Sequence, residues 1–124
     1  MTNTPTIDAL VSRWVDAFNA HDLNVHVQLY TEDAMLFGSD DMLHRGHAGV
    51  RRYFGGLPPD GSVRNFPAPV IVHLSPDTAV LAGYVDFADG DALLPYRLTW
   101  ALVRHNGHWK IAQHHGSPRK DRSA

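Results

Sequence analysis

The sequence predicts an α+β fold in which three helices pack on one face of a curved antiparallel sheet. Two observations carry this prediction. In the first half of the chain, apolar residues recur every three or four positions, as they do on one face of a helix. The second half consists of strand-like segments separated by short turns. The chain has 124 residues, of which 44% are hydrophobic and 19% are charged, and this suits a single domain over residues 1–124 with one core.

The first helix is predicted over residues 5–20. Thr4 can cap it, and Pro5 is tolerated in the first turn. Its apolar residues share one face, namely Ile7, Leu10, Val11, Trp14 and Phe18. Asp22 can cap a second, short helix that runs to about Tyr30.

Residues 34–38, AMLFG, form a short apolar strand in this prediction, and residues 43–46, LHRG, form a small second strand. The segment 47–59, HAGVRRYFGGLPP, predicts a third helix. The Gly55-Gly56 pair and then the Pro58-Pro59 pair stop it.

Four strands are predicted after the helices, over residues 63–75, 78–88, 93–105 and 108–117. Three turns divide them, at Ser75-Pro76-Asp77, Asp89-Gly90-Asp91 and Asn106-Gly107, and the last of these is a strong hairpin signal. We expect the core to cover about residues 7–117 and the polar tail 118–124 to be disordered.

Composition excludes several classes of function. The net charge is −2 and no basic block is present, so we expect no nucleic-acid partner. The chain has no cysteine, which rules out disulfides, thiolate nucleophiles and Cys-type zinc sites. It shows neither a signal peptide nor a long apolar run, so we expect a cytoplasmic protein without membrane contact.

Three stretches carry a family resemblance: AFNAHDLNVHVQLYTEDA, HRGHAGVRRYF and RHNGHWKIAQHHGS. Together they resemble the nuclear transport factor 2-like superfamily, with its ketosteroid isomerases, SnoaL-like cyclases and calcium/calmodulin-dependent kinase association domains. The resemblance implies a cone, built from three helices on a curved mixed or antiparallel sheet, with a deep apolar pocket. It also implies a homodimer formed through the sheet, with a small-molecule ligand in the pocket.

The last predicted strand contains two adjacent histidines. Side chains alternate along a strand, so His114 and His115 point to opposite faces. In similar sequences the set with Trp109 and Ile111 looks like packing, and the alternate set looks toward the cavity. This favours His114 as the pocket residue, although a bulge would reverse the assignment.

The same alternation predicts a cavity wall made by Tyr84, Asp86, Trp100 and His114. Asp86, His114 and Tyr84 are the candidate catalytic residues, because an imidazole titrates near neutrality and a phenol can stabilise an oxyanion. The candidate ligand-binding residues are aromatic: Trp14, Phe18, Tyr30, Tyr53, Phe54 and Trp100. The alternative interpretation is that Asp86 is an ordinary edge residue, that His114 is a satisfied core group and that the aromatic residues are packing.

The sequence also departs from its relatives. When the sequence is aligned with ketosteroid isomerases by the stretches above, Gly38 stands at the position of their catalytic base. Trp14 stands at the position of their oxyanion-binding tyrosine. When the sequence is aligned with the kinase association domains, Asp86, Trp100 and Gly116 stand at the positions of their pocket arginines. Nine histidines are present, but the pairs His44/His47 and His105/His108 lack a familiar metal-ligand spacing, so we expect no metal and interpret these histidines as solvated.

Two functions therefore remain open. The first is a cofactor-free acid–base enzyme of isomerase, cyclase, dehydratase or hydrolase type, acting on a small apolar ligand. The second is a non-catalytic association or ligand-binding module that forms a dimer or a larger oligomer.

Overall fold

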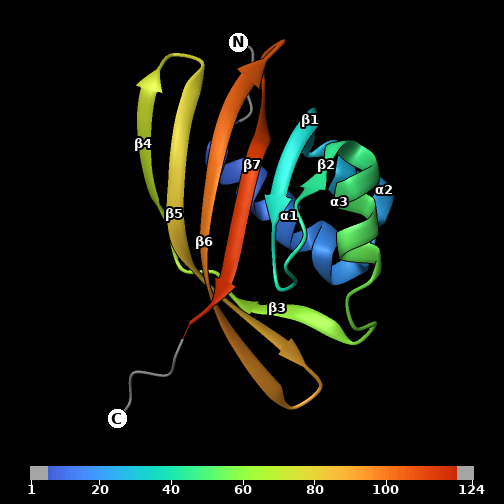
Figure 1. Cartoon of the computed structure of the whole chain (residues 1–124). Coiled ribbons are helices and arrows are strands. Elements are labelled where there is room, and N and C mark those ends of the chain that lie inside the picture. Colours follow the sequence, from blue (N-terminus) through green and yellow to red (C-terminus); the bar gives the residue numbers. More distant parts are fainter. Residues whose placement is uncertain (1–5, 120–124) are drawn as a thin grey trace.

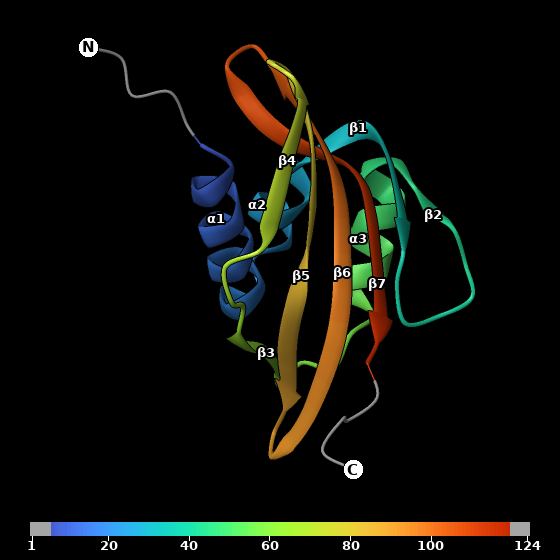
Figure 2. The same ribbon diagram turned by 90° about the vertical axis from the view of Figure 1, so that its left-hand side faces the viewer.

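A computed structural model describes residues 6–119 as three helices packed against one face of a curved sheet (Figures 1 and 2). The elements are α1 (Ile7–Ala20), α2 (Leu23–Gln28), β1 (Tyr30–Phe37), β2 (His44–Arg45), α3 (Gly46–Gly55), β3 (Gly61–Asn65), β4 (Val70–Ser75), β5 (Thr78–Asp89), β6 (Ala92–His105) and β7 (His108–Pro118). The sheet has seven strands in the order β2-β1-β7-β6-β5-β3, with β4 also paired to β5. The predicted fold class is confirmed.

Short polar side chains cap the first two helices. The Thr6 hydroxyl accepts a hydrogen bond from the Ala9 N–H, so α1 begins at Ile7. The predicted cap at Thr4 and the first-turn role of Pro5 lie outside the described residues. The Asp22 carboxylate accepts from the Val25 N–H and caps α2 as expected.

The second helix is shorter than predicted, because Tyr30 belongs to a strand. Leu29 ends α2, and Tyr30 then pairs with Ile111 of β7. The β1–β7 pairing is parallel, which makes the sheet mixed rather than wholly antiparallel. Its consequence is that the first strand lies beside the last one, in the middle of the molecule (Figure 1).

The predicted strand 63–75 is in fact two strands. β3 and β4 flank the segment 66–69, which contains Pro67 and Pro69, and proline cannot donate to a strand ladder. β3 pairs with the end of β5 near Asp89, whereas β4 pairs with its beginning near Thr78. The split lets β3 turn away from β4 across the base of the sheet (Figure 1).

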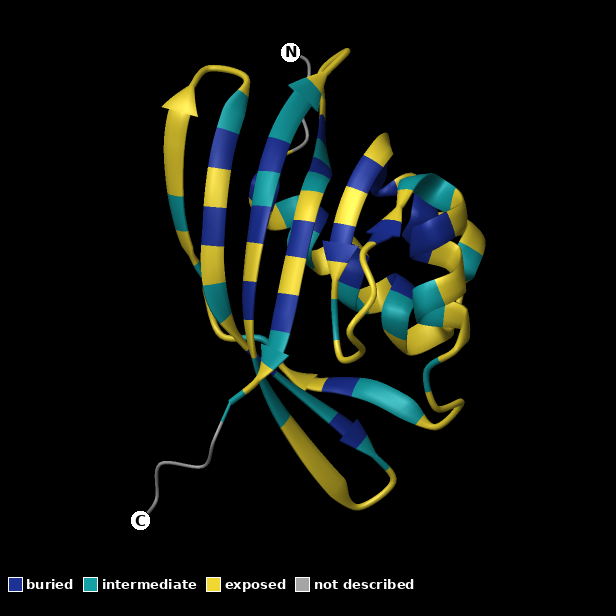
Figure 3. Cartoon of the chain, viewed as in Figure 1, coloured by how far each residue is buried: buried dark blue, intermediate teal, exposed yellow. Residues whose placement is uncertain are grey.

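The strands β5, β6 and β7 form the predicted meander. Buried and exposed residues alternate along them (Figure 3), so the face toward the helices carries the core and the opposite face is open. The predicted tail begins too early. β7 runs through Pro118, and the Arg119 N–H donates to the Pro95 carbonyl, while residues 120–124 lie outside the described part of the chain.

Candidate functional site

A small apolar cavity lies between the end of α3 and the far ends of β5, β6 and β7. Its volume is about 80 Å³. Its lining residues are mostly aromatic or aliphatic, with a few polar groups: Phe18, Ser39, Tyr53, Phe54, Leu57, Pro58, Gly61, Phe87, Ala88, Asp89, Leu94, Tyr96, Leu98, His114 and Gly116. An apolar hollow with few polar groups is typical of a small-molecule site.

The His114 imidazole is held by a buried network behind the cavity wall. The Tyr30 hydroxyl lies 2.9 Å from its Nδ1, and the Trp100 indole N–H donates to the same atom at 3.1 Å. The Trp14 indole N–H donates to the Tyr30 oxygen at 3.0 Å. All four side chains are at most 4% exposed, so these bonds lie away from water.

This network fixes the tautomer of His114. An indole N–H can only donate, so the Nδ1 atom of His114 must present its lone pair to Trp100. Because Nδ1 then carries no proton, the Tyr30 O–H can only donate to it, while the Tyr30 oxygen accepts from the Trp14 N–H. The proton of a neutral His114 therefore sits on Nε2.

Burial keeps His114 neutral. It lowers the pKa of His114 to about 3, and the nearby His26 and His115 add smaller effects in the same direction. Burial also raises the pKa of the Tyr30 phenol above its ordinary value, so Tyr30 keeps the proton that it donates.

The Nε2–H of His114 lies beside Gly116 in the cavity lining. A Cβ atom at Gly116 would come within 3.3 Å of Nε2, so any larger residue would crowd this nitrogen. Gly116 thus leaves the N–H open to the cavity, where the imidazole is a neutral hydrogen-bond donor at the end of an apolar hollow.

The predicted grouping of Tyr84 and Asp86 with His114 is wrong. Leu81, Trp100 and His114 lie opposite one another on the inner face. Tyr84 and Asp86 lie an odd number of residues from Leu81 along the same regular strand, so they project from the outer face.

On that outer face, Tyr84 is 51% exposed and takes part in a different contact. The Arg119 guanidinium lies over the Tyr84 ring, 4.9 Å from its centroid, and binds the Asp86 carboxylate at 3.4 Å. Tyr84 and Asp86 thus contact Arg119, just after β7, and do not line the cavity.

The six predicted ligand-binding aromatics divide into two sets. Phe18, Tyr53 and Phe54 line the cavity. Trp14, Tyr30 and Trp100 do not, because they are at most 1% exposed and lie behind its wall. Their contribution is to position the imidazole of His114.

Strict alternation along β7 fails at a bulge. The register between β6 and β7 shifts between Ala101 and Leu102, which adds one residue to β7 near Ala112. As a result Trp109, Ile111 and His114 are all buried, although simple alternation separates them. His114 lies on the inner face and lines the cavity, but the prediction that it faces away from Trp109 and Ile111 is wrong because of the bulge. His115 is exposed on the outer face beside Phe37.

The sequence analysis missed the polar groups at one side of the cavity. The Tyr53 hydroxyl accepts from the Ser39 N–H at 2.9 Å and donates to the Ser39 hydroxyl at 3.2 Å. Tyr96 and Asp89 also belong to the lining. Alternation from Leu98 and Trp100 along β6 could have placed Tyr96 on this face, but no sequence signal brings Ser39 to it.

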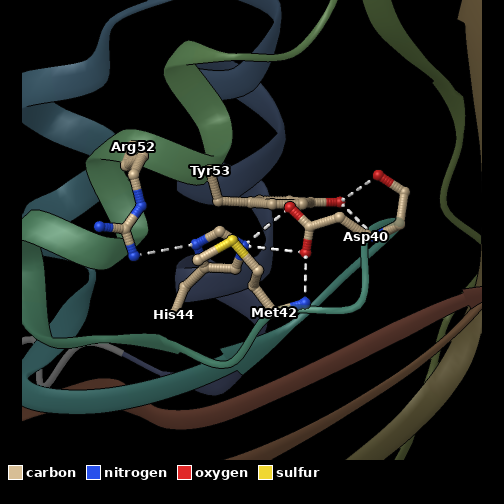
Figure 4. Close-up of polar contacts among 6 residues, drawn as sticks. Asp40, Met42, His44, Arg52 and Tyr53 are labelled. Atoms are coloured by element: carbon tan, nitrogen blue, oxygen red, sulfur yellow. Dashed lines mark hydrogen bonds and ion pairs between the residues drawn. The ribbon is translucent and has the colours of Figure 1, made fainter.

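A second polar cluster lies beside Tyr53 (Figure 4), and its residues Asp40, His44 and Arg52 do not line the cavity. The His44 Nε2 atom lies 3.0 Å from both carboxylate oxygens of Asp40, and the Arg52 guanidinium reaches the His44 Nδ1 at 3.5 Å. The hydrogen bond to His44 lowers the pKa of Asp40. His44 is only 2% exposed, so its interpretation as a solvated histidine is wrong.

His47 is also part of the structure rather than free in water. Its Nε2–H donates to the Tyr30 carbonyl at 2.8 Å, which ties α3 to the start of β1. Within residues 6–119, no three His, Asp or Glu side chains gather as metal ligands would.

The resemblance aligns Gly38 with the base of ketosteroid isomerases, and the structure leaves no room for a side chain at this position while Tyr53 stays in place. A Cβ atom there would lie 2.2 Å from the Tyr53 ring. The glycine lets the Tyr53 ring lie against the backbone just after β1, so an aspartate at this position and the observed Tyr53 exclude each other.

The family model of the SnoaL-like domain matches residues 7–120. The chain belongs to this SnoaL-like family. The match covers the helices, the sheet and the cavity described above. A search of curated protein sequences finds none that matches this chain.

Solved structures support the same fold. A candidate calcium/calmodulin-dependent protein kinase II association domain from Xanthomonas campestris is similar, with TM-score 0.84, 21% identity and coverage of 93% of this chain and 86% of that one. A ketosteroid isomerase-like protein from Erwinia carotovora atroseptica is similar with TM-score 0.82 and 17% identity. The match covers 95% of this chain and 97% of that one. Hexachlorocyclohexane dehydrochlorinase LinA-type3 from Novosphingobium barchaimii is similar with TM-score 0.79 and 16% identity. The match covers 92% of this chain and 84% of that one.

At these identities the structural likeness establishes the SnoaL-like fold alone. The described part of this family member contains no helix that is both long and apolar enough to span a membrane.

Proposed function

We propose that this SnoaL-like domain binds a small, largely apolar ligand and polarises one of its oxygen atoms through the Nε2–H of His114. One observation carries the proposal: both the Trp100 N–H and the Tyr30 O–H point at Nδ1. A preorganised neutral donor in a dry cavity stabilises charge that develops on a carbonyl or alkoxide oxygen.

This assignment makes His114 an electrophile rather than a base. Nε2 carries the proton and Nδ1 accepts two hydrogen bonds, so no lone pair of the ring faces the ligand. Proton transfer then falls to Asp89, the one carboxylate among the described lining residues. The reaction is cofactor-free acid–base chemistry, and the likeness to a ketosteroid isomerase-like protein and a dehydrochlorinase supports this class.

A ring ketone with a labelled carbonyl tests the proposal. Cyclopentanone carrying ¹³C at the carbonyl should bind the wild-type protein and show a downfield carbonyl shift, because a hydrogen bond withdraws electron density from that carbon. His114→Gln should keep a weaker shift, since an amide also donates, and His114→Phe should abolish it. A shift that survives in His114→Phe, or no binding to the wild type, would contradict the proposal.

Two rows of exposed side chains favour a second role, as a self-associating module. Val72, Val80 and Met35 belong to one row across the outer face and are 50%, 39% and 43% exposed. Val70 and Phe37 belong to the next row and are 67% and 38% exposed. An exposed apolar face of this kind fits a second copy of the same sheet.

Light scattering tests the homodimer. The wild-type protein at micromolar concentration should give at least twice the 13.8 kDa chain mass. Val72→Lys combined with Val80→Glu should give the mass of one chain, whereas the control Val25→Lys, on exposed α2, should not change the mass. A monomeric wild-type protein would exclude the dimer and leave the cavity proposal intact.

A further inference from the structure

His26 is a buried imidazole that the network around His114 does not use. It is 2% exposed, and its Nε2 atom has no hydrogen-bond partner within the described residues. Its ring is packed among aromatic rings, with centroids 4.2 Å from Phe54, 5.2 Å from Trp14 and 5.9 Å from Phe18. An unpaired nitrogen inside an apolar core is costly, so its retention calls for a partner that binds there.

The imidazole of His26 lines a second cavity beside the first. This cavity has a volume of about 170 Å³ and lies between α1, α2 and the end of α3. Phe18, Phe54, Leu57 and Pro58 line both cavities and therefore form the wall between them. The two hollows are separated by side chains and not by the sheet.

The volume of the first cavity limits the size of the ligand that can enter it without a movement of the shared wall. The first cavity, at about 80 Å³, is smaller than the roughly 150 Å³ known to hold a benzene molecule in a protein core. A ligand with one six-membered ring therefore does not fit while Phe54 stays in place. If Phe54 moves aside, the space on both sides of its ring becomes available to one ligand.

Phe54 lies between the two imidazoles. Its ring centroid is 4.2 Å from that of His26 and 6.0 Å from that of His114. A ligand ring that takes the place of the Phe54 ring would thus contact both histidines at once. Burial lowers the pKa of His26 to about 4, so both rings are neutral hydrogen-bonding groups at neutral pH.

We propose that His26 is a second ligand-binding residue, which hydrogen-bonds a hydroxyl group at the far end of a single-ring ligand whose other end accepts from His114. The ligand class is a six-membered ring with a carbonyl at one end and a hydroxyl at the other. The inference rests on the proposed function of the cavity and adds a specificity determinant to it.

Two ketones that differ by one hydroxyl test this proposal. Dissociation constants for acetophenone and 4-hydroxyacetophenone are measured by tryptophan fluorescence at pH 7 for the wild type and for His26→Phe. In the wild type the hydroxyl should tighten binding by about tenfold, as one buried hydrogen bond does. In His26→Phe the two ketones should bind equally, because the group that recognises the hydroxyl is gone.

Equal binding of the two ketones to the wild type, or a hydroxyl advantage that survives in His26→Phe, would overturn the role of His26. A second measurement covers a variant that fails to fold. The Nε2 ¹⁵N shift of His26 in the wild type should change much more with saturating 4-hydroxyacetophenone than with acetophenone, and equal changes with both would overturn the role. If acetophenone binds only when His114 is present and the hydroxyl has no effect, the proposed function stands and the role of His26 falls. If neither ketone binds although cyclopentanone does, the role of His26 falls and the proposed function stands, whereas a protein that binds none of the three ketones contradicts both.

Discussion

The Tyr30 hydroxyl and the His114 Nδ1 lie 2.9 Å apart, although 84 residues separate them along the chain. The parallel pairing of β1 with β7 brings them together, because it places the first strand beside the last. Tyr30 starts β1 directly after α2, and its ring reaches under the sheet to the imidazole. The tautomer of His114 thus depends on the parallel pairing of β1 with β7.

Removal of the Tyr30 hydroxyl should destabilise the protein. Tyr30→Phe leaves the Trp14 N–H without its acceptor in a fully buried site, which costs about 1–3 kcal/mol. Urea unfolding at pH 7 measures the loss. Tyr84→Phe is the matched control, since Tyr84 is half exposed on the outer face, and its free energy of unfolding should change by less than about 0.5 kcal/mol. Equal losses in the two variants would contradict the network.

The stability of the protein should fall as the pH drops from about 6.5 toward about 4. The unfolded chain takes up protons on its histidines below about 6.5, whereas folded His26 and His114 have pKa values of about 4 and about 3. Each histidine should therefore remove about 1 kcal/mol of unfolding free energy per pH unit over most of this window. Urea unfolding between pH 7 and 5 measures the slope.

Two variants test whether the buried histidines cause the pH dependence of the unfolding free energy. His114→Gln should reduce the slope by about half, because the group that titrates only in the unfolded chain is gone. His108→Gln, at the exposed turn between β6 and β7, is the control and should leave the slope unchanged. A slope that stays constant in His114→Gln would show that His114 is not held neutral in the folded protein.

A methyl group at Gly38 should disturb Tyr53. The added Cβ atom would lie 2.2 Å from the ring, so Gly38→Ala must push Tyr53 away from Ser39 at a cost of about 1–3 kcal/mol. Gly55→Ala is the control, since its Cβ would make an ordinary contact with Leu23 at 3.4 Å. Thermal unfolding compares the two, and a Gly38→Ala variant as stable as Gly55→Ala would contradict the close approach.

Local patterns were enough to predict the helices and the meander. The spacing of Leu10 and Trp14 in α1 and the Asn106-Gly107 turn are signals that neighbouring residues carry by themselves. The start of β1 was predicted too late because the short helix that Asp22 caps was expected to continue to about Tyr30. The parallel pairing with β7 decides between these alternatives, and a local pattern does not contain it.

The candidate site was predicted only in part, for a similar reason. The family resemblance pointed to His114, but alternation along β7 failed at the bulge near Ala112, and it says nothing about which face of β5 meets the face that carries His114. The structure pairs Leu81 with Trp100 and Trp100 with His114, and this register places Asp86 on the other side. The register between distant strands depends on packing of the whole sheet, so Asp86 could not be placed from its own segment.

The tautomer and charge of His114 test the central claim most directly. Long-range ¹H–¹⁵N NMR of the uniformly labelled protein at pH 7 distinguishes a protonated ring nitrogen from one with a free lone pair. The structure predicts a protonated Nε2 and an unprotonated Nδ1, and this state should persist when the pH is lowered to 5. A proton on Nδ1, or on both nitrogens at pH 7, would contradict the assignment of His114 as the neutral donor of the cavity.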